Sequence, residues 1–349
     1  MIVNSKFINI LFYGAAFHLG MRRGPYLVTF LPTLRCNARC QGCDIWRIDK
    51  SNDEMTFEEI KSVFDQLTDL KVVKITGGEP FIRRDLPDIL NYLLNERKIL
   101  VQVTSNGFLT DQIRRTVQEL ASPMLHVCIS LDGIREFVDT KRGIPGYYDS
   151  VIKTLGALAK IRKKKKFYIA VNQTVFNHAT TQIKALLPVL RDIGIENIHY
   201  TMEHNLFNRS ASEKDKKNYW KEIPGDQFTQ FKKSIGEVTL KNRIRDIAYK
   251  YYLKGLENRI LSGCKKPDFK CTALKSYFRL NPNGEILTCS VMNKPVANLN
   301  NKDFIEVWES HRVENARNKV ASCEGCWFGC EVIPNATIGG NIIEGLFYY

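Results

Sequence analysis

The sequence lacks a histidine pair, a long apolar run and an evident export signal. Its six histidines include no H-x3-H or similar spacing, so a histidine-based metal site is not indicated. The most apolar stretch, residues 7–20, would be about 21 Å long as a helix, too short to cross a ~30 Å hydrocarbon layer. No long cleavable signal sequence is evident, so we expect a cytoplasmic location in which cysteines stay reduced.

Three interpretations of residues 7–20 remain open. The stretch could pack against the fold, it could lie in a membrane interface with Arg22 and Arg23 at the headgroups, or it could be a targeting segment. The second interpretation predicts a peripheral contact with the inner face of the membrane through residues 7–23.

Acidic residues are outnumbered by basic ones. There are 37 Asp and Glu against 51 Lys and Arg, which gives a formal net charge of +14. This balance favours an anionic partner such as nucleic acid, a phosphorylated substrate, an acidic peptide or a membrane surface, although it could equally serve solubility. The chain is 44% hydrophobic and 25% charged, which is typical of globular proteins, and its 349 residues suffice for one large domain and a smaller one.

Cysteine, by contrast, is abundant and clustered. Cys36, Cys40 and Cys43 form a C-x3-C-x2-C loop, and six of the ten cysteines follow residue 260. Three thiols cannot pair completely as disulfides, and soft thiolates select zinc, copper(I) or an iron–sulfur cluster. Because no fourth cysteine lies within twenty residues, the loop would leave one iron of a [4Fe–4S] cluster open to a small molecule. A zinc site with a distant fourth ligand is the alternative.

A glycine run follows the next predicted strand. Gly77 and Gly78 can bring the backbone close to a ligand and free its N–H and C=O groups to bind it, and Glu79 and Pro80 complete a GGEP run. By itself this run indicates only a tight turn. Its position, one strand after the cysteine loop, makes the pair of motifs much more specific.

Together these motifs resemble the radical S-adenosylmethionine (SAM) enzymes. The resemblance implies that Cys36, Cys40 and Cys43 hold a [4Fe–4S] cluster whose open iron binds the amino and carboxylate groups of SAM. Electron transfer would then cleave SAM to a 5′-deoxyadenosyl radical that abstracts hydrogen from a substrate, and the GGEP run would hold the methionine amino group. Many members have an aromatic residue where this chain has Gly42, so Ile45 or Trp46 could substitute for it against adenine.

Strands and helices alternate from residue 26 onward. Predicted strands span 26–33, 71–76, 99–104, 124–131, 167–175 and 197–202, and predicted helices begin at the Thr56 capping box and span 85–96, 111–120, 151–159 and 180–193. Such alternation argues for an α/β fold with a parallel sheet, and the resemblance implies a partial (β/α)6 TIM-like barrel.

Polar residues occupy the carboxyl ends of these strands, where sites in such folds lie. They are Thr104, Ser105, Asn106, Ser130, Asp132 and Asn172. By position within the family's motifs, Thr104 and Ser130 would contact the ribose of SAM, and Asp132 and Asn172 are further candidate contacts.

The second cysteine set consists of Cys264, Cys271, Cys289, Cys323, Cys326 and Cys330. Residues 277–280 and 285–288 read as a hairpin with an Asn-Gly turn. The C-x(9–15)-G-x4-C pattern over 271–289 resembles the auxiliary-cluster domains called twitch or SPASM. The resemblance implies one auxiliary [4Fe–4S] cluster, with Cys271 and Cys289 as the firmest ligands, Cys323 and Cys326 next, and Cys264 and Cys330 as alternatives or a partial second site. A structural zinc ribbon is the alternative.

These features predict four segments. They are an apolar N-terminal helix (1–25), a radical SAM barrel (26–205), a variable loop with bridging helices (206–262) and a smaller cysteine-rich α+β domain of a hairpin plus helix (263–349).

The functional prediction is a radical SAM enzyme of oxidoreductase or transferase type. Its substrate would be a peptide or a membrane-associated lipid or glycan, and its electron donor a flavodoxin or ferredoxin; no nucleic-acid partner is expected. The 35 residues before Cys36 leave no room for a peptide-recognition domain, so a separate recognition protein could exist. The rival is a zinc-binding protein that engages RNA or an anionic membrane.

Overall fold

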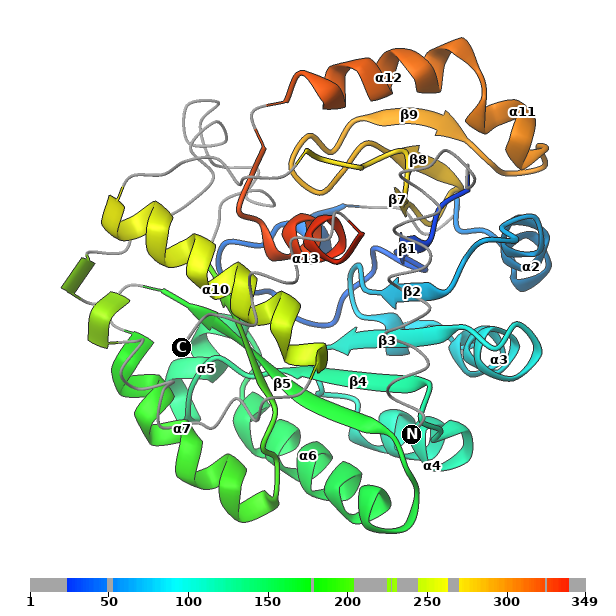
Figure 1. Ribbon diagram of the computed structural model, residues 1–349. Helices are drawn as coiled ribbons and strands as arrows, with labels where there is room; N and C mark the ends of the chain where they lie inside the picture. Colours follow the sequence, from blue (N-terminus) through cyan, green and yellow to red (C-terminus); the bar gives the residue numbers. More distant parts are fainter. Residues whose placement is uncertain are drawn as a thin grey trace.

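A computed structural model describes residues 24–48, 53–176, 179–203, 225–226, 228–230, 244–262, 270–323 and 325–338. At its centre lies a nine-stranded sheet of order β6-β5-β4-β3-β2-β1-β7-β8-β9 (Figure 1). The first six strands, which are all parallel, are β1 (Leu27–Phe30), β2 (Val72–Ile75), β3 (Leu100–Ser105), β4 (Leu125–Ser130), β5 (Tyr168–Val175) and β6 (Ile198–Met202). The predicted α/β fold with six parallel strands is therefore confirmed.

Helices connect successive strands, and the predicted ones are present. They are α2 (Phe57–Asp65), α3 (Leu86–Asn91), which continues as a π-helical turn (Tyr92–Glu96), α4 (Thr110–Leu120), α6 (Tyr147–Lys164) and α7 (Ala179–Ile193). The capping box of α2 is confirmed, because the Thr56 hydroxyl accepts from the Glu59 N–H and the Glu59 carboxylate accepts from the Thr56 N–H. Gly194, with φ +84°, ends α7 as predicted.

Among the described α-helices between β1 and β6, one was not predicted. It is α5 (Arg135–Arg142), in which Val138 is the one residue buried among charged neighbours, so the sequence shows little apolar periodicity. Gly143, in the left-handed region at φ +63°, ends it. A Cβ on Gly143 would lie 2.7 Å from the Arg39 carbonyl oxygen, which shows how closely α5 approaches the cysteine loop.

The C-terminal strands extend the barrel sheet. They are β7 (Tyr277–Leu280), β8 (Glu285–Leu287) and β9 (Pro295–Asn298). The predicted β7–β8 hairpin is confirmed, and Gly284 has φ +81° in its turn. In addition, β7 pairs in parallel with β1, so one sheet joins the regions that hold the two cysteine sets.

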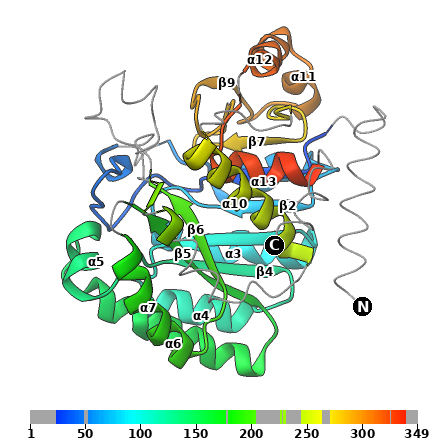
Figure 2. The ribbon, with the colours of Figure 1, turned by 60° about the vertical axis from the view of Figure 1, so that its left-hand side comes forward.

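Two further helices lie on the face opposite α4, α6 and α7 (Figure 2). These are α10 (Ile244–Ser262) and α13 (Gly329–Ile338), while α11 (Phe304–Trp308) and α12 (His311–Ala321) lie near β9. Gly255 of α10 accommodates Trp327, because a Cβ there would lie 1.9 Å from the indole. In the predicted bridging segment (206–262) the described residues 225–226, 228–230 and 244–262 are helical, and the predicted N-terminal helix and residues 206–224 lie outside the described residues.

The two faces of the parallel sheet differ in character. Residues such as Val73, Val101 and Val127 are fully buried, whereas alternate positions such as Thr104 and Ser130 are partly exposed. This alternation leaves polar side chains on the face away from the buried core. Within the described residues, no helix is long and apolar enough to cross a membrane.

Candidate functional site

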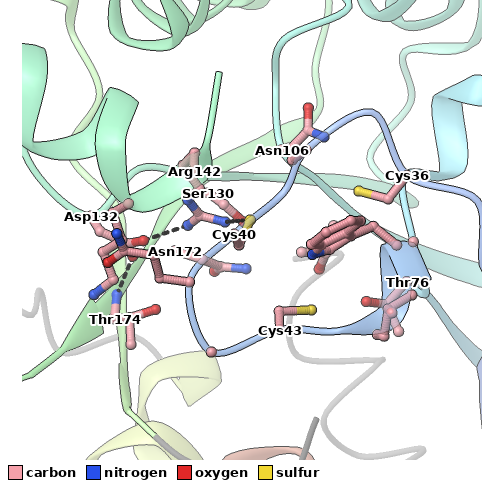
Figure 3. A pocket seen from close by; sticks show the side chains of 18 of the residues that line it. Cys36, Cys40, Cys43, Thr76, Asn106, Ser130, Asp132, Arg142, Asn172 and Thr174 are labelled. Atoms are coloured by element: carbon pink, nitrogen blue, oxygen red, sulfur yellow. Dashed lines mark hydrogen bonds and ion pairs between the residues drawn. The ribbon is translucent and has the colours of Figure 1, made fainter. Parts of the chain in front are cut away.

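A cavity of about 320 Å³ lies at the carboxyl ends of the parallel strands (Figure 3). The structure brings Cys36, Cys40 and Cys43 to its wall together with Gly77 and Gly78. The strand-end residues that also line it are Thr76, Thr104, Ser105, Asn106, Ser130, Asp132, Asn172 and Thr174. Residues more than 130 positions apart in the sequence therefore surround one cavity. The cysteine loop and the GGEP run together predicted such a meeting.

The cysteine loop leaves β1 and is held by the end of α5. The Arg39 N–H donates to the Arg142 carbonyl at 3.0 Å, and the Gln41 N–H donates to the Lys141 carbonyl at 2.8 Å. All three thiols are partly buried. Burial raises the pKa of Cys36 to about 12 and also raises the pKa of Cys43. These thiols would become ligands only with a cation beside them, which is how a metal cluster keeps thiolates ionised.

Arg142 is a cavity residue that the sequence analysis missed. Its Nη2 lies 2.6 Å from Asp132 Oδ2 and its Nη1 lies 3.8 Å from Cys40 Sγ, so the guanidinium stands between the carboxylate and the loop (Figure 3). Burial disfavours its charge, but Asp132 outweighs burial and keeps the pKa of Arg142 well above its usual value. No sequence signal distinguishes Arg142 from the other basic residues around α5.

Asp132 is fixed on both of its oxygens. Oδ2 accepts from Arg142, and Oδ1 accepts from the Thr174 N–H at 2.7 Å. Burial opposes ionisation, but the charge of Arg142 and the Thr174 N–H outweigh it and lower the pKa of Asp132. Asp132 therefore stays charged and orients Arg142 toward the cavity.

The GGEP run contacts the cysteine loop closely. A Cβ on Gly77 would lie 2.4 Å from the Thr33 carbonyl oxygen, and one on Gly78 would lie 2.0 Å from the Arg35 carbonyl oxygen. The Glu79 N–H donates to the Arg35 carbonyl at 2.8 Å. Only glycine allows this approach, which sets the cysteine loop against the end of β2.

Glu79 and Pro80 are buried and lie outside the lining of the cavity. The Glu79 carboxylate accepts from the Ser105 hydroxyl at 2.8 Å and from the Asn106 N–H at 2.7 Å. Burial raises the pKa of Glu79 to about 7 despite these hydrogen bonds. The side chain thus joins the end of β2 to the end of β3 beneath the cavity.

Trp46 and Ile45 line the cavity next to the cysteine loop. The guanidinium carbons of Arg47 and Arg39 lie 4.7 Å and 5.8 Å from the Trp46 ring centroid. These cation–π contacts stabilise the indole in its position. Contact of either side chain with adenine stays a prediction.

The second cysteine set divides by exposure. Cys271, Cys289 and Cys326 are partly buried, Cys323 and Cys330 are exposed, and Cys264 lies outside the described residues. Burial raises the pKa of Cys289 to about 12. Three N–H groups face sulfurs in this set: that of Met292 lies 3.2 Å from Cys289 Sγ, that of Gly325 lies 3.4 Å from Cys323 Sγ, and the Asn335 side-chain amide lies 3.7 Å from Cys271 Sγ.

Both sets have surroundings that suit a group that binds thiolates. At the first set the buried Nε of Arg142 has no hydrogen-bond partner, and at the second, N–H donors face the sulfurs. A cluster that engages several thiolates and accepts hydrogen bonds at sulfur suits these surroundings.

Comparison with protein families decides between the alternatives. The radical SAM superfamily model matches residues 30–187, and the SPASM model, an iron–sulfur cluster-binding domain, matches residues 271–327. The chain carries a radical SAM domain followed by a SPASM domain. These matches give no support to the zinc-binding alternative, and they agree with the cysteine sets at the two ends of this radical SAM protein.

Several curated proteins are similar to this radical SAM chain. The Fe-coproporphyrin III synthase of Methanosarcina barkeri is 33% identical over 37% of this chain and 33% of its own length. The subtilosin biosynthesis protein AlbA of Bacillus subtilis is 28% identical over 50% of this chain and 39% of its own length. The chain thus matches less than half the length of these two relatives. The AdoMet-dependent heme synthase of M. barkeri is 22% identical over 93% of this chain and 97% of its own length.

Solved structures share the fold. SuiB of Streptococcus suis bound to S-adenosylmethionine superposes with a TM-score of 0.64 at 16% identity, covering 87% of this chain and 73% of SuiB. The protein anSMEcpe with bound AdoMet and a peptide superposes with a TM-score of 0.60 at 16% identity, covering 93% and 97% of the two chains. At such identities the likeness shows a common fold, which agrees with the predicted partial barrel.

Proposed function

We propose that this protein is a radical SAM enzyme that modifies its substrate by hydrogen abstraction. The observation that carries the proposal is the meeting of Cys36, Cys40 and Cys43 with Gly77 and Gly78 at one cavity. A bound [4Fe–4S] cluster supplies the reductive cleavage of SAM to a 5′-deoxyadenosyl radical. The protein's part is to hold the cluster, orient SAM and exclude water from the radical.

The first part falls to the cysteine loop and its supports. Cys36, Cys40 and Cys43 would be the cluster ligands, and Arg142 would hold a positive charge beside Cys40. The hydrogen bonds between this loop and the end of α5 fix the backbone that presents the sulfurs. Because the cysteine sulfurs are already held in place, the loop has to move less when the cluster binds.

SAM would lie across the strand ends. Hydroxyl and amide groups of Thr104, Ser130 and Asn172 line the cavity, and they are suited to bind the ribose hydroxyls and the methionine moiety. A volume of about 320 Å³ lies at the lower end of the usual range for small-molecule sites, ≈ 300–1,000 Å³.

The auxiliary cluster would occupy the SPASM domain. We assign Cys271, Cys289 and Cys326 as ligands because they are partly buried, and Cys323, Cys330 or Cys264 would complete the set. The cluster would bind the substrate or carry electrons for it, with a flavodoxin or ferredoxin as external donor.

The substrate proposed first is a peptide. AlbA is a subtilosin biosynthesis protein, another relative is a PqqA peptide cyclase that is 27% identical, and SuiB has been seen with a precursor peptide. A porphyrin is the second candidate, because the heme synthase of M. barkeri matches this chain along 97% of its own length. Anionic porphyrin carboxylates also suit a chain of net charge +14.

The decisive test is anaerobic reconstitution with SAM and a chemical reductant. We expect brown protein with about eight irons per chain for two [4Fe–4S] clusters and formation of 5′-deoxyadenosine. Cys40→Ala should abolish 5′-deoxyadenosine, whereas Cys128→Ala, which changes a buried cysteine in β4, should retain it. Colourless protein that holds zinc would overturn the proposal.

The substrate class is tested separately by product analysis. Reconstituted protein is incubated with SAM, reductant and either candidate precursor peptides or Fe-coproporphyrin III. A mass change in the peptide supports the first candidate, and decarboxylation or another mass change in the porphyrin supports the second.

A membrane contact through residues 7–23 belongs to the same proposal, although these residues lie outside the described part of the chain. Co-sedimentation with anionic liposomes should fall in the Phe12→Glu, Phe17→Glu variant. Absence of binding by the parent protein would remove this part of the proposal.

A further inference from the structure

Helix α13 begins two residues after the end of the SPASM match, yet it reaches both of the firmest cysteine candidates. Two of its buried polar side chains, Glu331 and Asn335, lie one turn apart. Buried polar groups in a helix need partners, so their partners indicate what the helix is built to hold.

Asn335 is bonded to the segment that carries Cys271. Its Oδ1 accepts from the Thr272 N–H at 2.6 Å and from the Thr272 hydroxyl at 2.7 Å. Its Nδ2 donates to the Glu331 carbonyl at 2.7 Å and to the Tyr277 hydroxyl at 3.0 Å, and it lies 3.7 Å from Cys271 Sγ. Because Thr272 directly follows Cys271, the amide fixes the backbone beside this cysteine and places an N–H group near its sulfur.

Glu331 does the same for the segment that carries Cys289. Its Oε1 accepts from the Ser290 N–H at 2.8 Å, and Ser290 directly follows Cys289. The side chain is 4% exposed, so this bond is shielded from water. The two cysteines are 18 positions apart, but the same face of α13 holds the residue that follows each of them.

Helix α13 is itself anchored away from the cysteines. Its first residue, Gly329, lies beside the Tyr252 ring of α10, where a Cβ would be in van der Waals contact at 3.4 Å, and the preceding Trp327 packs on Tyr251. Packing on α10 therefore fixes the position of α13, and α13 in turn holds the two cysteine segments.

We propose that Asn335 and Glu331 are positioning residues for the auxiliary cluster, which hold Cys271 and Cys289 at the separation that it needs. Asn335 has a second role, because hydrogen bonds from N–H groups to ligand sulfurs raise the reduction potential of an iron–sulfur cluster. The inference rests on the auxiliary cluster of the proposed function and extends its site beyond the SPASM match.

The test isolates the auxiliary cluster in a Cys36→Ala, Cys40→Ala, Cys43→Ala background, where about four irons per chain should remain. In this background, Asn335→Leu and Glu331→Leu should each lower the iron content and the EPR signal of the reduced cluster at least twofold. Glu331→Gln keeps an acceptor for the Ser290 N–H and should restore the iron content. Asn315→Leu, which changes an exposed asparagine of α12, should match the background.

Asn335→Asp tests the effect of Asn335 on the reduction potential of the cluster while the hydrogen bond to the segment that carries Cys271 is kept. It keeps an oxygen for the Thr272 N–H, removes the N–H group near Cys271 and adds a negative charge, and both changes should make the midpoint potential of the cluster more negative. Circular dichroism shows whether the leucine variants fold, and the Asn335→Asp and Glu331→Gln variants decide the matter if they do not.

The outcomes separate the two proposals. If the background protein holds no iron, the auxiliary cluster is absent and both the proposal of that cluster and this inference fall. If it holds about four irons and the Asn335 and Glu331 variants match it in iron content and potential, only this inference falls.

Discussion

Arg142 and Asp132 form a buried ion pair, with Nη2 of one 2.6 Å from Oδ2 of the other, that joins the end of α5 to the end of β4. Their side chains are 14% and 3% exposed. The pair also sets a positive charge 3.8 Å from Cys40 Sγ. The ion pair thereby links the cysteine loop to strand ends that are distant from the loop in the sequence.

Breaking this pair should be costly. Asp132→Asn removes the partner of a buried cation, so we expect the free energy of unfolding to fall by about 3 kcal/mol. Urea denaturation measures this loss, and a double-mutant cycle with Arg142→Met should give a coupling above ~1 kcal/mol. The exposed pair Arg114–Asp111 is the control, for which the same cycle should give less than ~1 kcal/mol. Equal couplings for the two pairs would contradict the prediction.

Gly78→Ala should disrupt the site through a steric clash with the cysteine loop. The new Cβ would lie 2.0 Å from the Arg35 carbonyl oxygen, so the cysteine loop must move away from β2. We expect loss of most of the iron at the first cysteine set and a drop in 5′-deoxyadenosine of at least tenfold.

The control for this variant is Gly156→Ala in α6, where a Cβ would meet nothing within 4 Å. Alanine favours helix over glycine by about 1 kcal/mol, so this variant should be slightly more stable and fully active. Full iron content in the Gly78→Ala protein would show that the loop tolerates the displacement.

Glu79 should make stability depend on pH. Its pKa rises from 4.5 to about 7 on folding because the carboxyl is buried, so the folded state binds a proton more tightly than the unfolded state. The free energy of unfolding should therefore fall as pH increases from about 4.5 to 7, by up to ~3 kcal/mol, and level off above that range.

Denaturation of the parent and of Glu79→Gln from pH 5 to 8 measures this effect. The variant should have a smaller pH slope than the parent, since its amide does not titrate in this range. Parallel curves for the two proteins would mean that another group titrates.

Cys289→Ala should remove the auxiliary cluster and leave the cluster of the first cysteine set in place. Because Cys289 lies in the SPASM match and far along the chain from the cysteine loop, the variant should lose about four irons per chain and keep some SAM cleavage. Iron analysis and 5′-deoxyadenosine assays measure both quantities. Complete loss of SAM cleavage with the first cluster intact would instead tie the auxiliary site to the cleavage step.

The local sequence predicted most of the elements and the identity of the cavity wall. Strand and helix periodicity located the six parallel strands, the Thr56 capping box located a helix start, and the Asn-Gly turn located the β7–β8 hairpin. These features depend on residues within one turn or one hairpin of each other. Thr104, Ser130 and Asn172 were also predicted to lie together, because the carboxyl ends of parallel strands meet at the same edge of a sheet, and they line one cavity.

Relationships between distant segments needed the tertiary structure. The parallel pairing of β7 with β1, the position of Arg142 beside Cys40 and the bonds from α13 to the residues after Cys271 and Cys289 have no local signature. The sequence by itself determined which side chains are candidates to bind iron and SAM, since ligand chemistry belongs to residue types and their spacing. The tertiary structure alone decided which charges and hydrogen bonds surround them, because burial and long-range packing arise only when the whole sheet is assembled.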